Sequence, residues 1–181
     1  PASTLNVPIT YDLGDVIQEL EGAVDRHYGS IEERHELESR DRVDVAYEFT
    51  RERFRARLMG DVAHVGTTIT YQAKGWYDPP LLPEVGASCG MEDDDGPPPR
   101  LNVALSAQLS LTDNWELEAD AQVDAIGPLT DEDRDKCRVT PLNVDMTEHV
   151  VSAALAALVE RLPRIERSLA SIDLRSKFER W

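Results

Sequence analysis

The segment Leu101–Val123, LNVALSAQLSLTDNWELEADAQV, decides the fold because apolar residues alternate with other residues along two consecutive stretches. Every odd-numbered residue of 101–111 is apolar, and so is every odd-numbered residue of 115–123. A period of two is typical of a β-strand with one buried face. Because the turn-forming residues Thr112, Asp113 and Asn114 separate the stretches, the segment predicts a long hairpin with one apolar and one wet face.

Shorter alternating stretches on both sides of this hairpin predict further antiparallel strands. They cover residues 5–11, 43–49, 54–58 and 65–73, and a short strand is expected within 137–144. Pro8 cannot donate to a strand ladder, so the first strand is expected at an edge. Residues from Trp76 to Pro99, rich in proline and acidic side chains, are expected to form one long loop, at about 76–100.

Two stretches have the spacing of amphipathic helices. The first follows Asp12, includes His27 among its inward positions, and is expected to stop at Gly29. The second starts after Asp145, whose spacing from Glu148 is that of a capping box with Asp at the cap. Pro163 is expected to kink or break this second helix.

These elements predict a single α+β domain over residues 1–181. Each strand is apolar on one side only, and only two helices are available to cover that side. A flat sheet would leave apolar surface in water, whereas a strongly curved sheet wrapped around the helices would bury it. We therefore expect a helix-gripping roll, in which a curved antiparallel sheet surrounds long amphipathic helices.

The interior of such a roll is the candidate binding site. Small residues on the second helix and on the hairpin leave room for an apolar ligand, although they are equally expected where a helix and a sheet pack closely. The candidate groove residues come from both helices and from the hairpin. They are Val16, Leu20, Val24, Leu105, Leu109, Leu117, Val151, Ala154, Leu155 and Leu158.

Charge and motifs exclude several classes of function. The chain has 19 basic and 35 acidic residues and a net charge of −16, which disfavours nucleic acid and anionic lipid headgroups as partners. No apolar run reaches the roughly 20 residues of a transmembrane helix. Without a nucleophile elbow, a phosphate-binding loop or a dinucleotide fingerprint, we expect no enzymatic activity and no cofactor, although a hydrolase with an unrecognised site stays an alternative.

Metal binding has little support in the sequence. The four histidines lie in separate segments without zinc-site spacing. Asp131, Asp133 and Asp135 have the alternate spacing of the first ligands in a calcium loop, but Lys136 and Leu142 occupy the positions of its glycine and its bidentate glutamate. We expect no metal site and no tight calcium binding there.

Cys89 and Cys137 lie in polar, turn-rich segments rather than on apolar faces. Their even number and their position favour a disulfide, which would indicate export to an oxidising compartment. The alternative is two unpaired thiols in a reducing cytosol.

The chain resembles the bacterial domain-of-unknown-function family 4403 (DUF4403). The resemblance rests on residues 3–11 (STLNVPITY), residues 13–17 (LGDVI), residues 114–117 (NWEL), Cys137, and residues 145–149 (DMTEH), and it spans nearly the whole chain. Members are typically envelope lipoproteins about twice this long. The resemblance therefore implies a periplasmic or outer-membrane-associated protein, exported and lipidated at full length, of which this chain is the N-terminal lobe.

That family is in turn similar to the tubular lipid-binding (TULIP) superfamily, which includes bactericidal permeability-increasing and synaptotagmin-like lipid-binding domains. The similarity implies a lipid or other apolar ligand and supplies no matched ligand residues. We expect non-enzymatic binding or transport of a hydrophobic ligand in the cell envelope. The alternative is a fully packed interaction or structural module that docks a second lobe or another envelope protein.

Overall fold

The computed structural model describes residues 14–36, 41–91, 96–112, 116–139 and 144–170. β-Strands are the dominant secondary structure within these ranges. The elements in chain order are α1 (Gly14–Ala23), β1 (His27–Glu36), β2 (Val43–Arg51), β3 (Arg55–Met59), β4 (Val62–Tyr77), β5 (Val85–Cys89), β6 (Arg100–Leu111), β7 (Leu117–Pro128), a 3-10 turn (Asp133–Asp135), β8 (Arg138–Val139), β9 (Val144–Asp145) and α2 (Thr147–Ala170).

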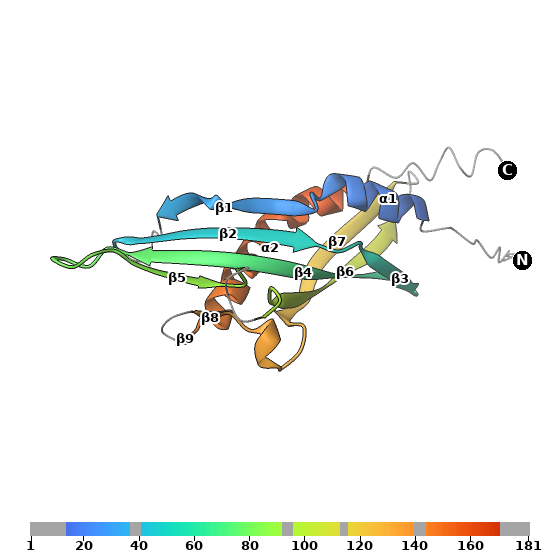
Figure 1. Cartoon of the computed structure of the whole chain (residues 1–181). Coiled ribbons are helices and arrows are strands. Elements are labelled where there is room, and N and C mark those ends of the chain that lie inside the picture. The colour runs from blue at the N-terminus through green and yellow to red at the C-terminus, as the bar shows by residue number, and fades with distance from the viewer. Residues whose placement is uncertain (1–13, 37–40, 92–95, 113–115, 140–143, 171–181) are drawn as a thin grey trace, which may run out of the picture.

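β1 to β7 form one antiparallel sheet around the long strand β4 (Figure 1). One side of β4 pairs with β2 and then, beyond a break at residues 52–54, with β3. Its other side pairs with β5 and β6. β1 and β7 lie at the two edges, next to β2 and β6.

One face of this sheet carries the apolar core. Leu20 of α1, Phe54 between β2 and β3, Val103 and Leu105 of β6, and Ile165 of α2 are buried together in a first cluster. A second cluster packs around Tyr71, Leu101, Ala154 and the two cysteines. Because α2 contributes to both clusters, it connects the two halves of the core.

The predicted hairpin is confirmed as β6 and β7, with one irregularity. Ala104 lies opposite Ala125, but the next residue, Leu105, lies opposite Val123, so Asp124 is an extra residue in β7. Asp124 accepts a hydrogen bond from the Ser106 hydroxyl at 2.6 Å. The extra residue changes the alternation, because after Val123 the next inward apolar residue is Ile126 rather than Ala125.

The prediction of a first helix of about four turns ending at Gly29 is wrong. α1 ends at Ala23, and both His27 and Gly29 belong to β1. Gly29 has φ +81°, and a Cβ built on it would lie 2.3 Å from the Tyr47 carbonyl oxygen. Pairing with β2 therefore determines the conformation of this segment, against its helical apolar spacing.

Several smaller predictions are also corrected. The long connection contains a strand, β5, and the segment 137–144 contains two short strands, β8 and the start of β9. α2 continues through Pro163 to Ala170. The predicted strand at residues 5–11 lies outside the described residues.

The expectation of an α+β helix-gripping roll is wrong. The described chain is mainly antiparallel sheet, and α2 packs chiefly against one edge strand, β7. Leu155 and Val159 of α2 are 37 % and 50 % exposed, so no sheet surrounds this helix. The apolar spacing of α2 predicts a wider buried face than the structure shows, because α2 packs along the edge strand β7 on one side only. There, the Ala121 N–H donates to the Glu166 carboxylate at 3.1 Å.

None of the described helices has the length and apolar character needed to cross a membrane.

Candidate functional site

The structure brings most of the predicted groove residues together, but in the packed core. Leu20 and Leu105 are buried in the first cluster, and Val24, Leu109 and Leu158 pack against it half-buried. In the second cluster Ala154 is buried and Val151 is half-buried. The centre of the predicted groove is therefore filled by the protein's own side chains.

Three predicted groove residues lie elsewhere. Leu117 is half-buried near the start of β7, opposite Leu111. Leu155 is exposed on α2. Val16 belongs to α1, but its side chain lies outside the described part of the structure.

An aromatic strip, formed by Tyr28, Tyr47, Phe49 and Tyr71, crosses the same sheet face on β1, β2 and β4. The register places Tyr28 opposite Phe49, and Phe49 opposite Tyr71. Consecutive ring centroids along Tyr28, Tyr47, Phe49 and Tyr71 are 5.5–6.1 Å apart, which is the range of favourable aromatic packing. The strip therefore forms one continuous apolar surface.

Exposure decreases along the aromatic strip. Tyr28 at the sheet edge is 40 % exposed, Tyr47 and Phe49 are half-buried, and Tyr71 is 1 % exposed. Burial and a hydrogen bond with Tyr28 raise the pKa of the Tyr47 hydroxyl above its ordinary value. The strip is thus accessible at the β1 end and closed at the β4 end.

α2 approaches the open end of the strip through a cationic side chain. The Arg161 guanidinium carbon lies 4.3 Å from the Tyr28 ring centroid, a cation–π geometry. Arg161 also donates to the Ala157 carbonyl at 2.8 Å, one helical turn earlier. Residues four apart lie on the same side of a helix, so Ala157 belongs to the side of α2 that borders the strip.

At the closed end, the Tyr71 hydroxyl is buried and has no hydrogen-bond partner within the described part of the chain. Burial raises the pKa of this hydroxyl, and the carboxylates of Asp145 and Asp135 raise it further. Buried polar groups without a partner are uncommon in proteins. The hydroxyl is available to a polar atom that reaches the end of the strip.

The sequence did not identify the aromatic strip as a site. The helical spacing of residues 16–27 predicts Tyr28 at the end of the first helix, and the alternation of Tyr47 and Phe49 predicts only a strand. The available signal was the pair of aromatic residues at alternate positions of one strand.

A hollow of about 400 Å³ lies between β6, β7 and the C-terminal part of α2. Its charged lining residues are Glu118, Asp120, Glu166 and Arg167.

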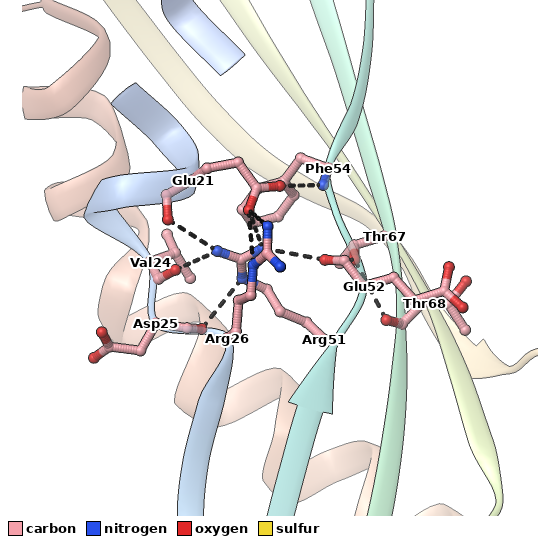
Figure 2. A network of polar contacts seen from close by, with 9 residues as sticks. All are labelled: Glu21, Val24, Asp25, Arg26, Arg51, Glu52, Phe54, Thr67 and Thr68. Atoms are coloured by element: carbon pink, nitrogen blue, oxygen red, sulfur yellow. Dashed lines mark hydrogen bonds and ion pairs between the residues drawn. The ribbon is translucent and has the colours of Figure 1, made fainter. Parts of the chain in front are cut away.

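The most densely bonded polar group in the described chain surrounds Arg51 (Figure 2). Its guanidinium donates to the Glu21 carboxylate at 3.0 Å and to four backbone carbonyls, those of Glu21, Val24, Asp25 and Glu52. An arginine side chain has five N–H donors, so all of them are used. Arg51 therefore fastens α1 to the sheet and has no donor left for an anionic ligand.

The Glu21 carboxylate accepts hydrogen bonds from three residues, Arg51, Arg26 and Phe54. Burial by itself raises the pKa of its carboxyl, but the Phe54 N–H, Arg51 and Arg26 stabilise the carboxylate and lower the pKa to about 2. The Phe54 N–H donates at 2.6 Å and Arg26 at 3.1 Å. Glu21 is therefore a carboxylate near neutral pH and a poor proton donor.

The predicted disulfide is confirmed. Cys89 and Cys137 are bonded with their Cα atoms 5.4 Å apart, and they join β5 to the segment that precedes β8. Near this bond, Asp135 is fully buried and accepts from Arg100 at 2.9 Å and from the Thr130 hydroxyl at 2.6 Å. Burial raises the pKa of Asp135, but these two donors lower it below its ordinary value.

Asp131 and Asp133 are exposed, whereas Asp135 points into the protein toward Arg100. The described residues contain no group of three or more histidine, cysteine or acidic side chains arranged to hold a metal ion.

Comparison with known proteins identifies the family. No curated protein matches the chain. The family described as Domain of unknown function (DUF4403) matches residues 1–181, and the chain therefore belongs to this family.

Proposed function

We propose that this protein is a non-enzymatic binder or carrier of an apolar ligand, such as a lipid acyl chain, and that the ligand lies along the aromatic strip beside α2. The observation that carries the proposal is the graded exposure of the strip, from Tyr28 at 40 % to Tyr71 at 1 %. An acyl chain on this surface would cover aromatic rings that water now reaches. Each buried methylene would contribute about 0.8 kcal/mol.

The chemistry at both ends of the strip suits an amphipathic ligand. Arg161 at the open end offers a cation to a carboxylate or phosphate headgroup. The buried Tyr71 hydroxyl at the closed end offers one hydrogen bond to a polar atom. Binding sites for small molecules typically combine mainly apolar walls with a few polar groups of this kind.

The proposed location is the bacterial cell envelope. The Cys89–Cys137 disulfide supports this location, because such bonds persist in oxidising compartments.

A second candidate function is docking of a protein partner or of a second lobe. Leu155 and Val159 are exposed and lie one turn apart on the same side of α2. They are a small apolar stripe on the side of α2 away from Arg161. In this alternative the aromatic strip is part of the core and takes no ligand.

Two substitutions on α2 distinguish these functions. Ala157→Trp places an indole beside the open end of the strip, and Ala156→Trp places the same indole on the exposed side of the helix. We expect Ala157→Trp to weaken binding of a dansyl-labelled fatty acid at least tenfold, with little change in melting temperature. We expect Ala156→Trp to bind the probe as the unchanged protein does.

An organic extract of the purified protein provides the independent measurement. Mass spectrometry should detect a stoichiometric amphipathic lipid in the unchanged protein and a depleted one in Ala157→Trp. The carrier function is excluded if the unchanged protein neither binds the probe nor yields a lipid. Complex formation that requires Leu155 and Val159 would then support the docking function.

A further inference from the structure

The loop between β4 and β5, residues 78–84, exposes large apolar side chains at the end of the sheet far from α1 (Figure 1). Leu81 is 103 % exposed and Leu82 is 67 % exposed. Behind them, at the ends of the two strands, Tyr77 is 46 % and Val85 is 44 % exposed. Exposed apolar residues that are grouped at one tip, rather than scattered singly, are typical of surfaces that contact a membrane or a protein partner.

Several bonds hold the base of this tip. Tyr77 pairs with Val85 at the base of the loop, and the Asp78 N–H donates to the Arg42 carbonyl at 3.1 Å. Arg34 donates to both carboxylate oxygens of Glu84, at 3.0 and 3.3 Å. Prolines occupy positions 79, 80 and 83, where each restricts the backbone. The strand pairing, the hydrogen bonds and the prolines therefore restrict the conformation of the loop that carries the two leucines.

The backbone of Leu81 is itself strained. Its φ is +69°, in the left-handed region that glycine and asparagine adopt far more readily than leucine. A strained residue whose side chain makes no folded-state contact indicates a role outside the fold.

The small size of the tip limits the kind of partner. A stable protein interface buries about 800 Å² on each partner, which a loop with two leucines at its apex cannot supply. Insertion into the apolar layer of a bilayer requires no complementary surface. Tyr77 and Trp76 lie directly behind the apex, and aromatic residues of this type favour the headgroup level of a membrane.

The charges near the tip indicate the kind of membrane. Asp78 flanks the apex on one side, the Glu84 charge on the other side is paired with Arg34, and the chain carries a net charge of −16. The Asp78 carboxylate and the net negative charge oppose contact with anionic headgroups. From these observations we propose that Leu81 and Leu82 insert into the apolar layer of a bilayer with electrically neutral headgroups, and that the loop is a membrane-docking tip.

Vesicle flotation with the full chain tests this inference. We expect the protein to float with phosphatidylcholine vesicles, to stay bound in high salt, and to bind less when anionic phosphatidylglycerol is added. The double substitution Leu81→Asn and Leu82→Gln should lower the partition coefficient at least tenfold, because burial of one leucine shifts an equilibrium by roughly tenfold or more. Its melting temperature should not fall, because asparagine tolerates the left-handed backbone.

A matched control lies at the opposite end of the sheet. Leu58 and Met59, at the tip of the β3–β4 hairpin, are 46 % and 58 % exposed. Changing both to glutamine should leave vesicle binding unchanged. Ala157→Trp should also leave it unchanged, which separates this inference from the proposed ligand site.

Three results would overturn the inference. They are no flotation of the unchanged protein, equal flotation of the Leu81→Asn and Leu82→Gln variant, and loss of flotation in the Leu58 and Met59 control. Capture of a specific protein through Leu81 and Leu82, without vesicle binding, would assign the tip to a protein partner instead.

Discussion

At the scale of single residues, Arg51 decides how the N-terminal helix joins the sheet. It is 8 % exposed, and its guanidinium carbon also lies 4.1 Å from the Phe54 ring centroid. Its carboxylate partner, Glu21, also accepts hydrogen bonds from the Phe54 N–H and from Arg26. A buried cation with complete hydrogen bonding is tolerated, whereas removal of the Glu21 carboxylate would leave the buried Arg51 without its ion-pair partner.

The two arginines on Glu21 differ in burial and provide a matched comparison. The Arg51 side chain is 5 % exposed and that of Arg26 is 54 % exposed. We expect Arg51→Met to lower the free energy of unfolding by about 3–5 kcal/mol, because it removes the buried ion-pair partner of Glu21 and the donor to four backbone carbonyls. Arg26→Met should cost about 0–1 kcal/mol. Urea unfolding of both variants measures the difference, and equal losses would contradict the assigned role of Arg51.

The pKa of Glu21 predicts a dependence of stability on acid. Folding lowers this pKa from 4.5 to about 2, so the unfolded chain binds the proton more readily. The stabilisation is complete above about pH 5 and is lost as the pH falls from 4.5 toward 2. Urea unfolding at a series of pH values should show this loss. In Glu21→Gln the loss should be smaller within that window, and an unchanged acid profile would contradict the assignment.

At the scale of elements, β1 shows how pairing overrides local preference. Most of its C-terminal half is charged, and its residues from Glu32 to Glu36 are exposed. Charged side chains on an edge strand disfavour pairing with other chains. Gly29 allows the backbone of β1 to lie against the Tyr47 carbonyl, which places Tyr28 over Phe49 on the aromatic strip.

Two glycines test this account of β1. Gly29→Ala places a Cβ within 2.3 Å of a backbone oxygen at a positive φ, and we expect a loss of about 1–3 kcal/mol. Gly22→Ala has nothing within 4 Å of the new Cβ in α1 and should stabilise the protein by up to about 1 kcal/mol. Thermal unfolding compares the two variants. A stable Gly29→Ala protein would mean that β1 does not require the observed close approach.

At the scale of the whole molecule, the disulfide connects parts that the sheet does not join. β5 belongs to the large sheet, whereas β8 and β9 form a separate two-stranded sheet that leads into α2. Asp145 accepts from the Thr147 N–H at 2.9 Å, which gives the first N–H group of α2 a partner. The disulfide therefore holds the start of α2 near β5 and the closed end of the aromatic strip.

Removal of this bond should destabilise the whole domain. The cysteines are 48 residues apart, and on the chain-entropy model closure of such a loop contributes about 4 kcal/mol. We expect the Cys89→Ser and Cys137→Ser double variant to lose about this much in urea unfolding. Adding a reductant should lower the stability of the unchanged protein and leave that of the double variant unaltered. A reductant effect on both proteins would show a cause other than this bond.

The sequence by itself determined the β6–β7 hairpin, the start of α2, the family and the disulfide. In each case the signal is local or depends on a small set of residue types: a period of two over residues 101–111, an aspartate before a helix, or two cysteines in polar segments. Such patterns keep their meaning wherever the segment lies in the fold.

The tertiary structure alone decided the end of α1, the strand β1 and the aromatic strip. The spacing of residues 16–27 suits a helix, but hydrogen bonds to β2 outweigh a preference of a few tenths of a kcal/mol per residue. Periodicity also cannot distinguish Leu105, which is buried in the core, from Leu155, which is exposed, because both occupy apolar positions of regular elements. Burial depends on which elements pack against a residue, and long-range pairing sets that packing.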